Sequence, residues 1–216
     1  MDMPVSNMQS SSFIEIIRQD LGEQQWQELD KDIIRRFTCL FRQKTLRYLG
    51  IVDWVYCSPI GKIIATILKP FSLLPDRCAR NSFFDFIIRQ QHDRLEKQRR
   101  YYIDQSSPFT FESIFNERPA VYEEFSGGLG MYLKLAVKRG SLLFRGQGYF
   151  LRIRKWRIPI PAWLSVGSFE LLHRNIDDRH FQVIIRIAHP LLGTLFYQRG
   201  EFFDIRSSEN IATINI

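Results

Sequence analysis

Residues 129–138 read LGMYLKLAVK, and this stretch decides the fold class. Every second position is apolar, at Leu129, Met131, Leu133, Leu135 and Val137. Because successive side chains of a β-strand point to opposite faces, this alternation gives one apolar face and one face that carries lysines. The stretch is therefore predicted to be a strand with one face in the core.

Alternation of the same kind begins at Ser82 and continues nearly to the C-terminus. Its apolar positions are Phe84, Phe86, Ile88, Phe109, Phe111, Phe115, Phe181, Val183, Ile185 and Ile187. Turn residues separate these runs, and most connections have hairpin length, which implies antiparallel pairing. About nine or ten strands are predicted, and so many strands normally curl or close. We expect a curled antiparallel sheet or barrel, with a β-sandwich as the alternative.

The N-terminal part differs, because its apolar residues recur at helical spacing. A first helix is expected to stop near Gly22 and a second to begin near Asp30, before a first strand over residues 45–56. Ser58 and Pro59 then offer an N-cap and a first-turn proline for a helical insertion after this strand. The expected fold class is mainly β, within α+β, with N-terminal helices.

Length and composition indicate one domain that spans residues 1–216. Hydrophobic residues make up 45% of the chain, and phenylalanine alone occurs 18 times, which excludes a disordered chain. We expect the core to cover about residues 13–205 and residues 206–216 to form a loose polar tail.

The compartment expected is the cytoplasm. The three cysteines have no CxxC spacing and cannot all pair, and residues 1–12 lack the apolar run of a secretory signal. The longest apolar stretch, residues 60–74, is cut by two lysines and a proline, so no membrane-spanning helix is predicted.

Four histidines without clustered partners predict no metal site. His173 and His180, on either side of an Asp-Asp turn, are expected at its solvated end.

Several short motifs follow one another in a fixed order. They are Leu21-Gly22, Leu74-Pro75, Arg99 with Tyr101, Glu123-Glu124-Phe125 before Gly127, Trp156-Arg157-Ile158-Pro159-Ile160-Pro161, Glu170, Phe181 with Val183, Pro190-Leu191-Leu192-Gly193, and Tyr197 with Gly200. With them, the chain from about Leu21 to Phe203 resembles a bacterial family known only as domain of unknown function 4166. It departs from the family at Lys97, Phe37 and Gly128, where Trp, His and Pro are usual. The resemblance implies an association with NAD-binding, saccharopine-dehydrogenase-like domains, and it implies no activity.

Motifs for nucleotide cofactors or for a serine nucleophile are absent from the sequence. The glycine-rich residues 127–130 lie between two predicted strands, whereas a dinucleotide-binding GxGxxG motif leads from a strand into a helix. No GxSxG sequence occurs. No cofactor is therefore predicted.

The excess of aromatic residues is the most informative chemical feature. Alternating Phe and Tyr on strands that curl around a common interior can enclose an apolar cavity, although the same residues would also fill a solid core. The leading interpretation is a non-enzymatic module that binds an apolar small molecule or lipid, whose polar head a buried Arg or Glu holds. The candidate ligand-binding residues are Arg99, Glu124, Glu170, Tyr197, Phe84, Phe86, Phe111, Met131 and Leu133.

Two other classes of function stay open. If Glu124 and Glu170 point inward, they pair with Arg99 in a pocket where one carboxylate acts as a general acid or base, as in an enzyme or its accessory domain. Otherwise each lies on a solvated strand face beside basic neighbours. The net charge of +7 permits docking to nucleic acid or to an anionic membrane, but no motif for sequence-specific nucleic-acid recognition occurs.

Overall fold

The computed structural model describes residues 13–43, 45–71, 73–91, 94–103, 108–116 and 120–204. Within them the helices are α1 (Phe13–Glu28), α2 (Lys31–Gln43) and α3 (Pro59–Ile67), with short 3₁₀ turns η1 (Lys69–Phe71), η2 (Ser126–Gly128) and η3 (Ala162–Leu164). The strands are β1 (Thr45–Cys57), β2 (Ala79–Gln91), β3 (Arg94–Tyr102), β4 (Phe109–Asn116), β5 (Tyr122–Phe125), β6 (Leu129–Lys138), β7 (Ser141–Ile153), β8 (Trp156–Ile160), β9 (Ser168–Asn175), β10 (His180–His189) and β11 (Gly193–Asp204).

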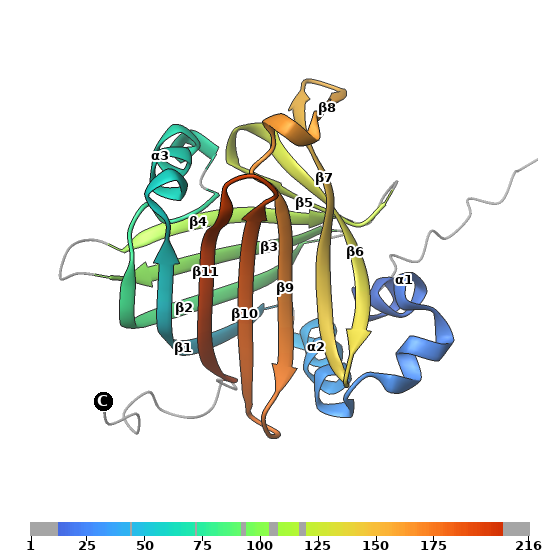
Figure 1. Cartoon of the computed structure of the whole chain (residues 1–216). Coiled ribbons are helices and arrows are strands. Elements are labelled where there is room, and N and C mark those ends of the chain that lie inside the picture. The colour runs from blue at the N-terminus through green and yellow to red at the C-terminus, as the bar shows by residue number, and fades with distance from the viewer. Residues whose placement is uncertain are drawn as a thin grey trace, which may run out of the picture.

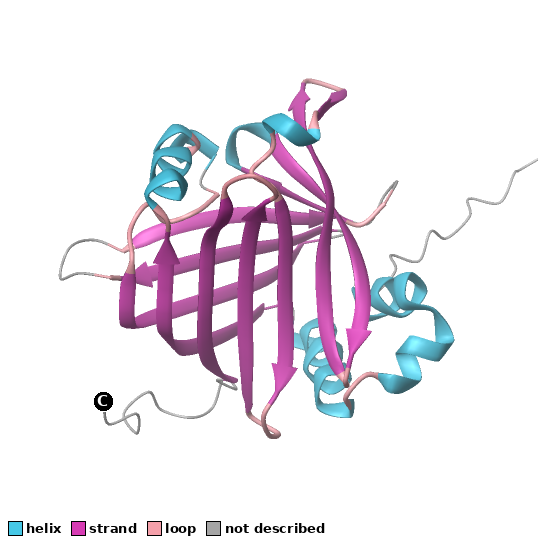
Figure 2. Cartoon of the chain, in the orientation of Figure 1, coloured by secondary structure: helices cyan, strands magenta, loops and turns pink. Residues whose placement is uncertain are grey.

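Ten strands close into one antiparallel barrel (Figure 1), and strand is the dominant secondary structure (Figure 2). The order around the barrel is β6-β5-β4-β3-β2-β1-β11-β10-β9-β7, and β7 pairs back with β6. Closure gives each of these strands a neighbour on both sides, which protects the edges that an open sheet would expose. The predicted antiparallel barrel with N-terminal helices and an insertion after the first strand is confirmed, and β8 is an additional strand outside it.

Strand β7 leaves the barrel wall because its two halves have different partners. Residues 142–145 pair with β9, whereas residues 149–153 pair with β8. The register between β6 and β7 slips between Tyr132 and Leu133, opposite the change of partner. A bulge of this kind bends a strand, so the β7–β8 hairpin projects from one end of the barrel (Figure 1).

Helix α1 takes the place of a strand beside the second half of β6. Strand β5 has only four residues and cannot accompany β6 along its length. Instead, the Asp20 carboxylate accepts a hydrogen bond from the Leu135 N–H at 2.7 Å, and the Gln25 side-chain oxygen accepts one from the Val137 N–H at 2.9 Å. These contacts satisfy backbone donors that would otherwise form an open edge.

The helix boundaries follow the local chemistry of the sequence. Gly22 adopts φ 72° and kinks α1, but the helix continues to Glu28 instead of stopping near Gly22. The Asp30 carboxylate accepts a hydrogen bond from the Asp32 N–H at 2.8 Å at the start of α2. The predicted polar tail, residues 206–216, lies outside the described residues. Within the described part of the chain, none of the helices is both long and apolar enough to cross a bilayer.

Helix α3 lies at the opposite end of the barrel from α1 and α2 (Figure 1). Ser58 caps it as predicted, since its hydroxyl oxygen accepts a hydrogen bond from the Gly61 N–H at 2.9 Å. Gly61 also brings the helix against β11, because a Cβ atom at this position would lie 2.3 Å from the Leu195 carbonyl oxygen. The absence of a side chain at residue 61 therefore sets how closely α3 docks.

We expect Gly61→Ala to destabilise the chain, although alanine is the better helix former by about 1 kcal/mol. Forcing α3 away from Leu195 should cost more than this gain, since overpacking a close contact costs about 1–3 kcal/mol. The midpoint of urea unfolding should fall for Gly61→Ala and stay unchanged for Lys62→Ala on the exposed face of the same helix. A more stable Gly61→Ala protein would show that this contact does not limit docking.

Candidate functional site

The barrel interior contains a cavity rather than a solid core. About 130 Å³ is open to the centres of water-sized molecules. A single water needs only about 10–15 Å³ in this measure. Phe13 and Phe37 of the N-terminal helices border the cavity at one end, and Leu73, Leu74 and Pro75, from the connection after α3, border it as well. The space is sufficient for a small organic molecule.

Most of the cavity wall is apolar. Phe86, Phe169, Leu171 and Val183 line the cavity and pack against the hydrophobic core, yet each is only half-buried. Part of each side chain thus borders open space instead of protein atoms. A ligand in the cavity would meet aromatic and aliphatic surface over most of its extent.

One part of the wall carries a buried charged cluster. The Lys97 ammonium lies 3.1 Å from one carboxylate oxygen of Glu123, and the Ser113 hydroxyl donates to the other oxygen at 2.5 Å. Arg99 donates to the Ser113 oxygen at 3.2 Å and lies 3.6 Å from the Glu123 carboxylate. Two cations therefore share one anion at the edge of an apolar cavity.

The strand period explains why these charges point inward. On β3, Lys97 and Arg99 lie on the same face of the strand as the buried Leu95 and Tyr101, because these residues are spaced two apart. Glu123 likewise stands two residues from the buried Phe125, on the same face of β5. Lys97 and Glu123 are not among the candidate residues predicted from the sequence, although this phase relation is visible there.

The cluster shifts the acid–base properties of its members. Burial alone would raise the pKa of Glu123, but the adjacent Lys97 and Arg99 outweigh burial and lower this pKa to about 2. Burial lowers the pKa of Lys97, and Glu123 offsets part of that effect. Glu123 is therefore an ionised counter-charge at neutral pH.

Two buried polar atoms of cavity-lining residues lack a hydrogen-bond partner among the described residues. They are the Arg99 Nε atom and the Tyr149 hydroxyl. Tyr101 provides a contrast, because its hydroxyl donates to the buried Gln198 side chain at 2.8 Å. Burial raises the pKa of both tyrosines, to about 12 for Tyr101, so both hydroxyls keep their protons. Arg99 and Tyr149 thus offer donors to a molecule in the cavity.

His173 lies inside the barrel, so the prediction that it sits at a solvated turn is wrong. Its ring stacks on Phe181 at 4.5 Å between centroids, and its Nε2 atom lies 3.1 Å from a guanidinium nitrogen of Arg36. Arginine only donates, so Nε2 accepts and the ring is neutral. Burial, followed by the charge of Arg36, lowers the pKa of His173 to about 3. In the described part of the chain, no three His, Cys, Asp or Glu side chains gather as a metal ion requires.

The structure brings four of the predicted residues to the cavity. Arg99, Phe84, Phe86 and Met131 line it. Phe111 and Leu133 are buried but belong to the packed wall rather than to the cavity lining. Whether any of these residues binds a ligand stays a prediction.

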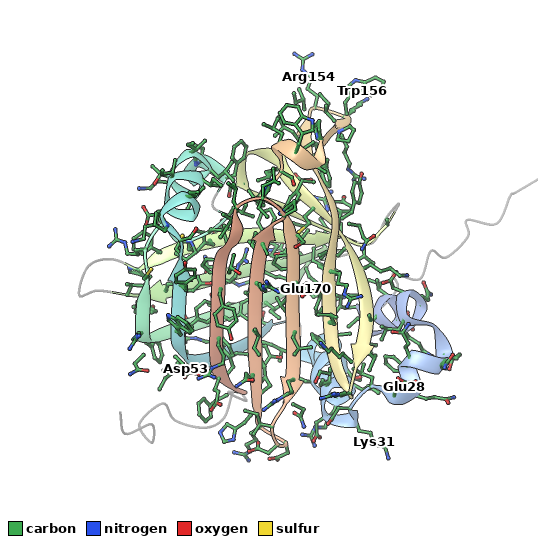
Figure 3. The ribbon with its side chains drawn as sticks, in the orientation of Figure 1. Glu28, Lys31, Asp53, Arg154, Trp156 and Glu170 are labelled. Carbon is green, nitrogen blue, oxygen red and sulfur yellow. The ribbon has the colours of Figure 1, made fainter. Side chains whose placement is uncertain are left out.

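The other three predicted residues lie away from the cavity. Glu124 pairs with Arg152, with 2.6 Å between the carboxylate and Nε. Glu170 is half-buried on the outer face (Figure 3) and lies 3.4 Å from Arg145. The side chain of Tyr197 packs against the exposed Trp54 instead of the interior. Both glutamates thus follow the alternative in which they lie beside basic neighbours, because each is out of phase with the inward residues of its strand.

Comparison with known proteins places this barrel in a family defined by sequence. Over 169 residues, the chain is 26% identical to the uncharacterized protein YndH of Bacillus subtilis (strain 168), an alignment that covers 75% of each chain. The family described as "Domain of unknown function (DUF4166)" matches residues 29–202, which include α2 and nearly the whole barrel. The chain belongs to this DUF4166 family.

Proposed function

We propose that the barrel binds one compact apolar molecule that carries a hydrogen-bond acceptor at one end. The observation that carries this proposal is the pair of unpartnered donors, Arg99 Nε and the Tyr149 hydroxyl, on side chains that line a mostly apolar cavity. A buried donor without a partner costs about 1–3 kcal/mol. A ligand that supplies an acceptor offsets this cost, while its apolar part fills the rest of the space.

The charge of the wall favours an anionic acceptor such as a carboxylate. Lys97 and Arg99 together exceed the single negative charge of Glu123. The histidine of the lining, His173, is neutral because its pKa is about 3. A carboxylate in the cavity would therefore complete the charge balance, and its hydrogen bonds to Arg99 would be charge-assisted.

The size of the cavity limits the ligand to a ring or a short chain. Cavities of about 150 Å³ accept a benzene-sized molecule in other proteins. Burial of apolar surface contributes about 25 cal/mol per Å², from which the cost of immobilising the ligand is subtracted. Together these values support micromolar rather than nanomolar dissociation constants.

Calorimetric titration with octanoate and with 1-octanol tests the proposal on the unaltered chain. We expect octanoate to bind with a micromolar Kd, and 1-octanol to bind at least about tenfold more weakly, since hydrogen bonds to a charged group contribute about 1.5–3 kcal/mol. Equal affinities would contradict the role of Arg99. No detectable binding of either compound, together with an unliganded mass in native mass spectrometry, would contradict the binding module itself.

A matched pair of variants on β10 locates the site. Val183→Phe fills the cavity from an inward position and should weaken octanoate binding at least tenfold, since the ligand loses the space it occupies. Ile184→Phe places the same side chain on the other face of the strand and should leave affinity unchanged. Thermal unfolding of both variants shows whether each is folded. The predicted association with an NAD-binding partner rests on the family resemblance alone and stays a prediction.

A further inference from the structure

Large apolar side chains are exposed at one end of the barrel. This end, called here the α3 end, comprises α3, the β7–β8 hairpin with η3, and the β10–β11 turn (Figure 1). The six most exposed large apolar residues of the described chain, with 61–88% of their surface accessible, all lie there: Ile63, Ile67, Trp156, Trp163, Leu164 and Leu191. Exposed apolar surface that gathers in one region marks an interaction site.

The same end is rich in positive charge. Residues 54–75 and 149–169, which include α3 and the β7–β8 hairpin of this end, contain six basic residues and no Asp or Glu. Among the described residues, no carboxylate lies within ion-pair distance of Lys62, Lys69, Arg154 or Lys155. The neighbouring carboxylates are already paired: Glu124 contacts Arg152, and Asp76 lies 3.5 Å from Arg77. The α3 end thus presents cations without a paired carboxylate beside the six exposed apolar side chains, which are called here the apolar tips.

We infer that the α3 end docks on the surface of an anionic lipid bilayer. The apolar tips enter the interface, where tryptophan is particularly favourable, and the cations lie against the lipid head groups. Each basic residue near such a surface adds electrostatic attraction to the anionic lipids. Figure 3 shows Arg154 and Trp156 together at the outermost part of the hairpin. A flat surface that meets this end would therefore contact both side chains.

The shape and chemistry of this end favour a bilayer over other acidic partners. The tips stand on three separate projections, so they contact a deformable plane more readily than the single groove or face of a protein (Figure 1). Four of the six tips are aliphatic and cannot stack on nucleic-acid bases, which use aromatic platforms. This docking does not depend on whether the cavity holds a ligand.

Co-sedimentation of the full chain with vesicles provides the test. We expect binding to vesicles that contain phosphatidylglycerol, much weaker binding to pure phosphatidylcholine, and a loss of binding at about 1 M salt, where charges are screened beyond about 3 Å. The double change Arg154→Glu with Lys155→Glu should lower the partition coefficient at least about tenfold. Its matched control is Lys31→Glu, because Lys31 lies at the opposite end of the barrel (Figure 3).

A second pair of variants tests the apolar contribution. Trp163→Ser with Leu191→Ser should lower the partition coefficient about tenfold, since both side chains leave the lipid interface. Ile176→Ser, an exposed position in the distant β9–β10 turn, should have no effect. Brominated lipids should quench tryptophan fluorescence of the unaltered chain. No binding to anionic vesicles at low salt, equal effects of Lys31→Glu and the Arg154/Lys155 change, or lipid-independent self-association that Leu191→Ser abolishes would each overturn the inference.

Discussion

Glu123→Gln is expected to lower the free energy of unfolding by about 3–5 kcal/mol, the range for a buried ion pair that loses one partner. The amide has nearly the same shape as the carboxylate, so packing is retained. However, Lys97 at 3.1 Å and Arg99 at 3.6 Å lose their counter-charge within an apolar wall. Because burial already lowers the pKa of Lys97, its deprotonation should relieve part of the loss as the pH rises.

The matched control is the neighbouring residue. Glu124→Gln removes one carboxylate charge from the same strand but on its outer side, where its partner Arg152 is half-exposed and solvent screens the charge left behind, so the loss should be smaller. Urea unfolding at neutral pH measures both variants. In addition, Lys97→Met introduced into Glu123→Gln should restore part of the stability, since one unpaired cation is gone. Equal losses for the two glutamine variants would contradict the charge balance of the cluster.

The predicted strands and helices follow from residue periodicity, whereas the contacts that complete the barrel do not. The alternation over residues 129–138 predicts β6 with its inward face, and Ser58 with Pro59 predicts α3. The sequence carries no comparable signal that Asp20 and Gln25 of a helix would satisfy the backbone of β6. Such contacts join residues more than 100 positions apart, and no local pattern encodes them.

The candidate site likewise has features that the sequence predicts and features that it does not. Alternation places Glu123 with the inward residues of its strand and Glu124 with the outward ones, so this choice could be made from the sequence. Alternation also places His173 on the face of β9 that carries Phe169 and Leu171. Its contacts with Arg36 from α2 and Phe181 from β10, which keep it neutral, have no local signal in the sequence. The cavity itself has no sequence signal, since aromatic side chains that line a space and those that fill it alternate alike.

The buried charges bear on the enzyme alternative as well. A general base is most effective when its pKa lies near the working pH, whereas the pKa of Glu123 is about 2. The two glutamates that were to form an inward acid–base pair lie outside the cavity, each beside an arginine. The arrangement therefore supports binding and charge balance better than proton transfer.

His173 is expected to make stability depend on pH above the range in which carboxylates titrate. Its pKa is about 3 in the folded chain and 6.5 when unperturbed. The unfolded chain therefore takes up a proton as the pH falls below about 6.5, while the folded chain does not. Protonation stabilises the unfolded state, so the free energy of unfolding decreases as the pH decreases. From pH 7 to pH 5 this contribution amounts to about 2 kcal/mol, at about 1.4 kcal/mol per pKa unit.

The pH window separates this effect from that of Glu123. The depressed pKa of Glu123 contributes stability that is complete above about pH 4.5 and lost only as the pH falls toward 2. Urea unfolding at pH 7 and at pH 5 thus separates the effect of His173 from that of Glu123. His173→Gln keeps an acceptor for Arg36 but cannot titrate, so the difference between the two pH values should shrink by about 2 kcal/mol even if the variant is less stable throughout. An unchanged pH dependence in His173→Gln would mean that His173 is protonated inside the barrel, and the neutral hydrogen bond to Arg36 would then be wrong.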